Sequence, residues 1–411
     1  MKNIIFIILT ASLICSCNDL LVEKPQAIAV ETFYNTVNEI EAGVAAIYTP
    51  LRSGNCFRAE YSVILEEMSD ITWEGIGSWR PPSMYQGLDG TNITRVSNTW
   101  RQFYLAVRNA NIMIEAIPNA NSVSDKDVFI GEAMFLRALS YFHLVRCWGA
   151  IPLRTVENMY ENNLPRTSET EVYDLIISDL KFAESTLPTT VPVVGHPTKW
   201  SAKMLLADVY FYLNQYDKAA ELSNEIIQSK QYNLVEVKTT DDFEKLYGAT
   251  VVNTPEEIFY FKFHDTDGFS MAYYFHGSGN AGEYIRQNGY NVITNHNSHP
   301  VYINHDNDDL RKGLWYLYTL RTPNVYLLKK FNDLEGTSPR NSFPLYRFAD
   351  CLLMYAEASC RISSGPTTAG IEALNMVHRR AYGYPSTQVS PVDFNIEDYN
   401  KESFIELCIK E

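Results

Sequence analysis

Apolar residues recur with a helical period over most of this chain. Between residues 37 and 51, Ile40, Val44, Ala45 and Tyr48 fall on one face of a predicted helix. The same spacing predicts further helices over residues 100–117, 132–147, 171–183, 200–229, 345–362 and 367–380. The hydrophobic pattern therefore predicts a mainly α fold.

Residues 200–229 form the clearest repeat unit. The offsets of a tetratricopeptide helix pair are met by Leu206, Ala207, Tyr210 and Ala219. Further pairs are predicted from 132–147 with 171–183, and from 345–362 with 367–380. A single pair of this kind is an ordinary helical hairpin, but one pair cannot bury its apolar face alone. Three pairs therefore predict a stacked helical scaffold.

Two regions break the helical pattern. Residues 72–95 and 233–340 are rich in Gly, Pro and Asn, and we expect them to be loop-rich insertions. Within the second region, residues 258–263 predict a short strand. Loops this long are usually functional rather than connective.

The N-terminus is typical of an exported lipoprotein. Lys2 precedes a short apolar run, which suits a cleaved signal peptide over residues 1–16. The run ends in Ile14-Cys15-Ser16-Cys17, which resembles a bacterial lipobox. We therefore expect Cys17 to carry lipid (diacylglyceryl and an acyl chain such as palmitate) and residues 17–36 to be a tether. The alternative is an ordinary signal peptide with an incidental cysteine.

Composition narrows the classes of partner. The chain has 411 residues, 46% of them hydrophobic, and a formal net charge of −15. We expect a helical domain over residues 37–411, with no nucleic-acid partner because the charge is acidic. No segment beyond the leader is expected to cross a membrane. No CxxC pair indicates a zinc site or a disulfide framework, and Cys147, Cys351 and Cys360 are expected to be buried thiols.

Longer motifs resemble a known family. The sequence EAMFLRALSYF at 132–142, then LVR at 144–146 and WGAIPL at 148–153, resembles the SusD/RagB family of Bacteroidota nutrient-capture surface lipoproteins. Further matches are Arg166, residues 172–173, residues 179–180, WSAKMLLADVY at 200–210, RFADCLLMYAEA at 347–358 and ALNMV at 373–377.

The resemblance implies a helical fold and a specific partner. That partner is a SusC-like TonB-dependent outer-membrane transporter, with the helical repeats docked on the barrel and the irregular side holding a glycan. Family members usually continue past Lys410-Glu411, so a truncated C-terminus is expected. The ligand loops of this family vary, so the resemblance transfers no glycan-contact residue to this chain.

Flat aromatic rings and polar side chains in the two insertions are the candidate glycan contacts, because sugars present C–H faces and hydroxyl rims. The first insertion offers Trp73, Trp79, Arg80, Tyr85 and Asn92. The second offers Tyr273, Tyr274, Tyr284, Arg286, Asn288, Tyr290 and Trp315. The alternative is that these rings fill the cores of long loops.

No catalytic or metal motif stands out. Glu66 and Asp70 are spaced to share a helix face, but nothing beside them indicates a nucleophile or a tuned acid. The cluster His296, His299, His305, Asp306, Asp308 and Asp309 matches no metal-site spacing, and residues 309–311 resemble a family turn. Together with the family resemblance, this leads us to expect an outer-membrane protein that binds glycans or other nutrient oligomers, without catalysis, cofactor or metal. The alternatives are a surface glycoside hydrolase and a scaffold without a small ligand.

Overall fold

The computed structural model describes residues 33–69, 72, 77–279, 283–290, 292, 294–296, 298–320 and 324–411, without the side chains of 295 and 296. The predicted leader, Cys17 and most of the tether lie outside these residues. The α-helices are α3 (Val37–Leu51), α4 (Glu60–Glu67), α5 (Arg80–Ser83), α6 (Gly90–Ala116), α7 (Lys126–Trp148), α8 (Glu169–Thr186), α9 (Lys199–Tyr212), α10 (Tyr216–Gln228), α11 (Glu244–Tyr247), α12 (Ala272–Phe275), α13 (Pro300–Ile303), α14 (Phe348–Ile362), α15 (Thr368–Ala381) and α16 (Lys401–Lys410). The strands are β1 (Glu257–Phe261), β2 (Asn295–His296), β3 (Trp315–Tyr318), β4 (Val325–Leu328) and β5 (Phe343–Arg347).

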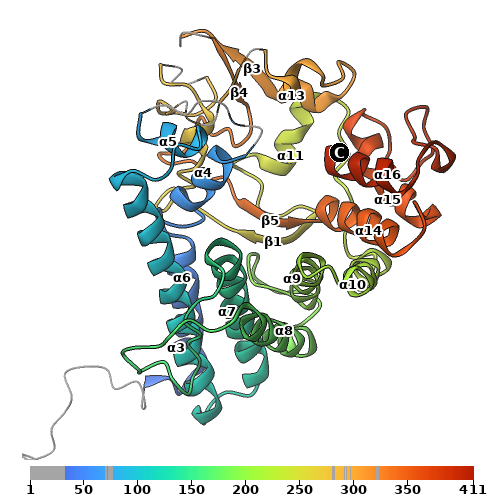
Figure 1. The fold of residues 1–411 in the computed structure, drawn as a ribbon. Helices are drawn as coiled ribbons and strands as arrows, with labels where there is room; N and C mark the ends of the chain where they lie inside the picture. Colours follow the sequence, from blue (N-terminus) through green and yellow to red (C-terminus); the bar gives the residue numbers. More distant parts are fainter. Residues whose placement is uncertain are drawn as a thin grey trace, which may run out of the picture.

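The three predicted helix pairs are present and stack on one another. Helix α7 packs on α8, α9 on α10, and α14 on α15, while contacts of α8 with α9 and of α10 with α14 join the pairs. Figure 1 shows this scaffold curving through the lower and right-hand parts of the molecule. Ala207 and Tyr210 are buried, as their positions in the repeat predict.

Helix starts follow local capping chemistry. The Thr36 side chain accepts from the amide of Glu39, and the Glu39 carboxylate accepts from the amide of Thr36. The same reciprocal arrangement begins α8 at Ser168 and Glu171. Each such box satisfies two helix-end donors, which is why these boundaries are readable in the sequence.

The region 72–95 is more helical than predicted. Helix α6 begins at Gly90, ten residues before the predicted start, because the Asp89 side chain accepts from the amide of Asn92 and caps the helix. A 3-10 turn (Gly77–Trp79) and the short α5 precede it. The prediction of a continuous loop was therefore wrong for most of this segment.

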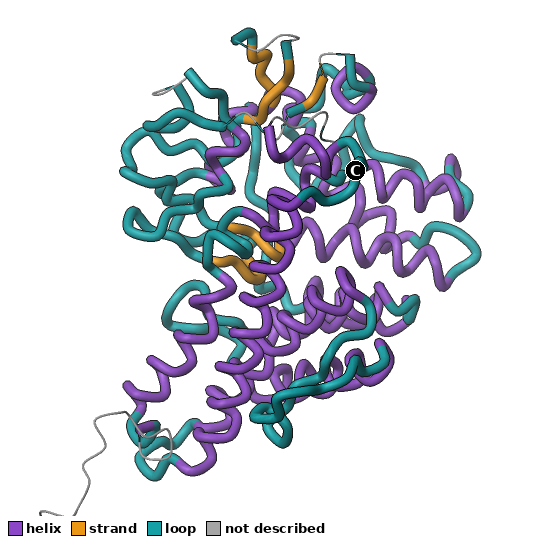
Figure 2. Tube along the Cα trace, turned by 60° about the vertical axis from the view of Figure 1, so that its left-hand side comes forward, coloured by secondary structure: helices purple, strands orange, loops and turns teal. Residues whose placement is uncertain are grey.

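The strands form two small sheets within the irregular part of the molecule. Strands β1 and β5 pair antiparallel, and β2, β4 and β3 form a three-stranded antiparallel sheet in that order. Figure 2 shows one sheet near the centre and the other at the top. The predicted strand at 258–263 is confirmed with shifted ends, whereas residues 345–347, predicted to be helical, belong to β5.

One expectation about cysteine burial was wrong. Cys351 and Cys360 are buried as predicted, but Cys147 is exposed because it lies at the solvent-facing end of α7. In addition, α7 is long and apolar enough by composition to cross a membrane. However, 78% of its most apolar window is buried inside the protein, so its composition reflects the core.

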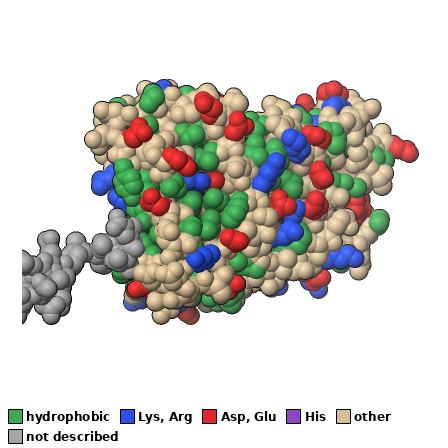
Figure 3. All heavy atoms as spheres, turned by 90° about the horizontal axis from the view of Figure 1, so that it is seen from below, with side chains coloured by type: hydrophobic (Ala, Val, Ile, Leu, Met, Phe, Trp, Pro, Cys, Tyr) green, Lys and Arg blue, Asp and Glu red, His purple; other side chains and the backbone are tan. Residues whose placement is uncertain are grey.

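The lower end of the molecule in Figure 1 is seen face-on in Figure 3. Apolar side chains gather toward the middle of this face, and acidic and basic side chains are interspersed around them. Among the described residues that this view shows, no continuous basic surface of the kind that binds nucleic acid is present.

Candidate functional site

Three tyrosines from two segments of the second insertion form a common surface, called here the tyrosine surface. Tyr290 lies edge-on to Tyr274, with ring centroids 5.0 Å apart, and tilted against Tyr273 at 5.5 Å. Tyr290 is half exposed, and Tyr273 and Tyr274 are partly exposed. Such rings offer both flat apolar faces and hydroxyl groups.

Backbone hydrogen bonds join the segment that contains Tyr273 and Tyr274 to the segment that contains Tyr290. The amide of Tyr290 donates to the carbonyl of Tyr273 at 2.6 Å, and the amide of Val292 donates to that of Tyr274 at 3.1 Å. Gly289 allows this approach, because a Cβ there would lie 2.0 Å from the carbonyl oxygen of His276. The surface is therefore built by close backbone contact rather than by a regular element.

Trp79 packs against Tyr274 of this surface. It is buried, with 7% exposure, and meets Tyr274 edge-on at a centroid distance of 5.4 Å. The Arg95 guanidinium lies 3.6 Å from the Trp79 ring centroid and 3.7 Å from the Glu60 carboxylate. Trp79 thus fills the core of its loop, as the alternative reading of the aromatic residues held. No local pattern in the sequence indicated the role of Arg95.

The hydroxyls of Tyr273 and Tyr274 keep their protons near neutral pH. Burial, together with the nearby Tyr290, raises the pKa of Tyr274 to about 12. Burial also raises the pKa of Tyr273. Protonated phenols both donate and accept hydrogen bonds, which matches the hydroxyls of a sugar.

The polar side chain of Gln287 hydrogen-bonds a tyrosine of this surface directly. The Tyr273 hydroxyl donates to the Gln287 side chain at 3.3 Å, and the exposed Asn288 accepts from the amide of Gly279 at 3.1 Å. Arg286 is exposed, and its Nη1 donates to the carbonyl of Glu335 at 3.3 Å. Asn92 is fully buried, and its side-chain amide donates to the carbonyl of Ser78 at 2.7 Å, so it holds the loop.

Tyr85 lies at a separate apolar pocket of about 510 Å³. The pocket is formed by α4, α6, the segment after α5 and the end of α7, and its walls include Leu65, Met68, Leu88 and Trp148. Tyr85 is 67% exposed, has a left-handed backbone with φ of 52°, and donates from its hydroxyl to the Met68 carbonyl at 2.6 Å. Sequence reasoning found Tyr85 but missed the pocket, whose walls come from four segments.

Among the described residues, the other predicted aromatic and basic side chains, Tyr284, Trp315 and Arg80, do not join the tyrosine surface. Tyr284 packs on Tyr316, with centroids 4.5 Å apart, and stacks on His276. Trp315 lies on β3 opposite Leu328, and Arg80 is exposed at the start of α5. Trp73 and Asp70 lie outside the described residues, so the helix face that Asp70 was predicted to share with Glu66 lies outside them too. Burial raises the pKa of Glu66.

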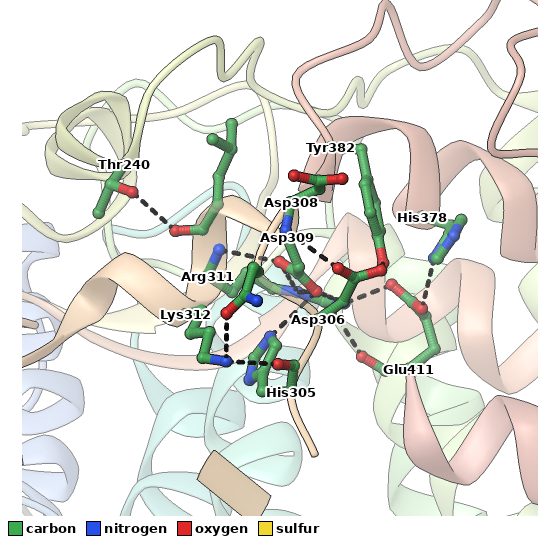
Figure 4. A network of polar contacts seen from close by, with 12 residues as sticks. Thr240, His305, Asp306, Asp308, Asp309, Arg311, Lys312, His378, Tyr382 and Glu411 are labelled. Atoms are coloured by element: carbon green, nitrogen blue, oxygen red, sulfur yellow. Dashed lines mark hydrogen bonds and ion pairs between the residues drawn. The ribbon is translucent and has the colours of Figure 1, made fainter. Parts of the chain in front are cut away.

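The histidine and aspartate cluster near residue 305 is an ion-pair network. Arg311 makes a two-pronged contact with Asp309, and His305 Nε2 lies 3.1 Å from the Asp309 carboxylate. Figure 4 shows these side chains facing one another, with Glu411 joining Arg311 to His378. Burial opposes ionisation of Asp309, but hydrogen bonds from His305 and Arg311 hold its pKa below the ordinary value.

This network ties the irregular region to the C-terminal helices. The Tyr382 hydroxyl donates to Asp306 at 2.9 Å, and His299 caps the short α13. Within the described part of the chain, no three His, Cys, Asp or Glu side chains are placed to hold a metal ion. The cluster therefore has a structural use in joining elements.

Comparisons with known sequences all point to the same family of proteins. Residues 26–211 match a family model described as "Starch-binding associating with outer membrane", and residues 256–411 match one described as "SusD family". SusD-like protein P2 of Formosa agariphila is 27% identical over 92% of this chain and 81% of its own length. SusD-like protein P38 of the same organism is 33% identical over 57% of this chain and 47% of its own length.

Solved structures have the same fold. A SusD homolog from Bacteroides thetaiotaomicron superposes with a TM-score of 0.77 at 19% identity, covering 93% of this chain and 84% of that one. A laminarin-binding SusD-like protein gives a TM-score of 0.71 at 22% identity, covering 91% of this chain and 89% of that one.

Proposed function

Because this chain belongs to the SusD/RagB family, we propose that it binds glycans without cleaving them and delivers them to a SusC-like TonB-dependent transporter in the outer membrane. The tyrosine surface is the observation that carries the glycan site. Tyr273, Tyr274 and Tyr290 present partly exposed rings and hydroxyl groups beside Gln287 and Asn288. This combination matches the C–H faces and hydroxyl rims of sugars.

The proposed ligand is a neutral glycan. The chain carries a formal net charge of −15. Long-range repulsion disfavours polyanionic glycans, although screening limits its reach to about 8 Å at physiological ionic strength. One solved structure of this fold binds laminarin, so laminarin belongs in the first glycan panel.

Anchoring and docking complete the proposal. Cys17 is the proposed lipid anchor, which would hold the protein at the outer membrane facing the exterior. Its substitution Cys17→Ala should abolish fatty-acid incorporation, whereas Cys15→Ala should not. The apolar side chains gathered at the helical end support docking of this face on the transporter (Figure 3).

Binding and catalysis are separated by one assay. Titration calorimetry with a neutral glycan panel should give binding, and chromatography of the same mixtures should show no shortened products. Tyr290→Ala and Tyr274→Ala should each weaken binding by about 1–3 kcal/mol, by analogy with base stacking on aromatic rings. Tyr212→Ala, an exposed tyrosine on α9, is the matched control.

The alternatives make different predictions in this assay. Product release would favour a surface glycoside hydrolase. Absence of binding to every glycan would favour a scaffold without a small ligand. Unchanged binding by both tyrosine variants would place the glycan site elsewhere on the molecule.

A further inference from the structure

A second polar cleft lies on strand β1, away from the tyrosine surface. Two adjoining hollows of about 390 and 180 Å³ meet at residues 194–196 and share Tyr260 as a wall. We call the larger hollow the β1 cleft; its walls include Tyr48, Arg52, His196, Tyr260, Lys262 and Asp267. None of the residues lining it belongs to the tyrosine surface or to the pocket at Tyr85.

The loop over the cleft depends on a glycine. Gly195 has a left-handed φ of +93°, and a Cβ there would lie 3.0 Å from the Lys262 side chain. Both features favour glycine, because other residues would meet backbone strain as well as crowding. The loop therefore approaches the strand closely enough to place His196 at the junction of the hollows.

A buried carboxylate fixes the polar groups that face the cleft. Glu132, which is 5% exposed, accepts from the Tyr48 hydroxyl at 2.5 Å and lies 2.8 Å from His196 Nδ1. The hydrogen bond to Glu132 is the largest of the influences that raise the pKa of His196. With Nδ1–H held by Glu132, the Nε2 atom of His196 is left to meet a ligand.

The charges around the cleft are paired. Arg52 lies 2.5 Å from the Asp267 carboxylate, and Lys262 lies 2.5 Å from that of Glu257. A strongly charged ligand would therefore meet a cation and an anion together. A hydroxyl group suits such pairs better, because it donates to the carboxylate and accepts from the cation at once.

We propose that the β1 cleft is a second ligand site. It binds the terminal one or two sugar units of a neutral glycan. His196 Nε2 and the Arg52–Asp267 pair bind its hydroxyls, and the half-buried Tyr48 ring lies against it. The site goes beyond the proposed function, because the tyrosine surface binds glycan without it.

The test follows the histidine ring NMR resonance of His196 while maltose, cellobiose or laminaribiose is added. Concentrations reach about 20 mM, which would saturate a site with a Kd of about 1 mM. At least one disaccharide should shift the resonance saturably. Asp267→Asn should weaken this response about tenfold, because hydrogen bonds to charged groups are the stronger ones. Ala45→Trp, at an exposed wall position, should block the cleft without disturbing the core.

Tyr290→Ala separates the two sites. It should leave the His196 response unchanged, while Ala45→Trp should leave glycan binding at the tyrosine surface unchanged. The proposal is overturned if no disaccharide shifts the His196 resonance. It is equally overturned if Ala45→Trp retains the full response, or if Tyr290→Ala abolishes it.

Discussion

Arg137 on α7 and Asp179 on α8 form a buried, two-pronged ion pair. Arg137 Nε lies 2.8 Å from Asp179 Oδ2, and Nη2 lies 2.7 Å from Oδ1. The remaining Nη1 donates to the side-chain oxygen of Asn111 on α6 at 2.7 Å. One guanidinium therefore joins three helices, and both charged residues lie in motifs that carry the family resemblance.

Removing one partner of this pair should destabilise the protein strongly. Arg137→Ala or Asp179→Ala should each lower the free energy of unfolding by about 3–5 kcal/mol, because an unpaired buried charge remains. The combined Arg137→Met and Asp179→Leu variant should recover most of this loss. Urea unfolding measures the effect, with the exposed Asp174→Ala on α8 as the control. Equal stability of all these variants would show that the Arg137–Asp179 pair does not stabilise the fold.

Trp79→Ala should act on stability first. The side chain is buried between Tyr274 and Arg95, so its loss should lower the free energy of unfolding by about 3–4 kcal/mol. Tyr290→Ala, at a half-exposed ring, should change stability by less than about 1 kcal/mol while weakening glycan binding. Thermal melting of both variants checks this. A melting midpoint of Trp79→Ala equal to that of the wild type would show that Trp79 is not part of the loop core.

Acidification should destabilise the protein through His276. Burial lowers the pKa of this ring to about 4, against about 6.5 in an unfolded chain. Between these pH values the unfolded state binds a proton that the folded state does not. The free energy of unfolding should therefore fall by about 1.4 kcal/mol per pH unit from pH 6.5 toward 4.

The His276 effect is isolated by substitution. His276→Gln should flatten the pH dependence of urea unfolding over this window, and the exposed His264→Gln should leave it unchanged. Parallel pH profiles for His276→Gln and the wild type would rule out this source of acid sensitivity.

Arg311 should control how firmly α16 is held. Arg311→Met leaves the Asp309 and Glu411 carboxylates, each 5% exposed, without their shared cation. We expect the free energy of unfolding to fall by about 2–3 kcal/mol. Amide hydrogen exchange should become faster in residues 305–312 and in α16. Lys410→Met, at an exposed position, should exchange like the wild type. Faster exchange in residues 305–312 alone, with α16 unchanged, would mean that the network does not support α16.

The sequence by itself determined the helical scaffold. The helix over residues 37–51 and the three helix pairs were predictable, because helix formation depends on contacts three or four residues apart. Predicted helix starts were wrong in two cases. Asp89 caps a helix within a Gly-, Pro- and Asn-rich segment, and at residue 347 a strand runs directly into a helix. The buried roles of Cys351 and Cys360 also followed from their apolar helical settings.

Only the tertiary structure decided how the aromatic residues are used. Trp79 meets Tyr274, almost two hundred residues away in the chain, and this contact buries one predicted ligand residue beneath another. Tyr284 and Trp315 carry the same chemistry in the sequence but pack elsewhere. Exposure of a loop side chain depends on backbone contacts between distant segments, such as that of Tyr290 with Tyr273. No local period encodes such contacts, so the sequence supplied the candidate rings and the fold selected among them.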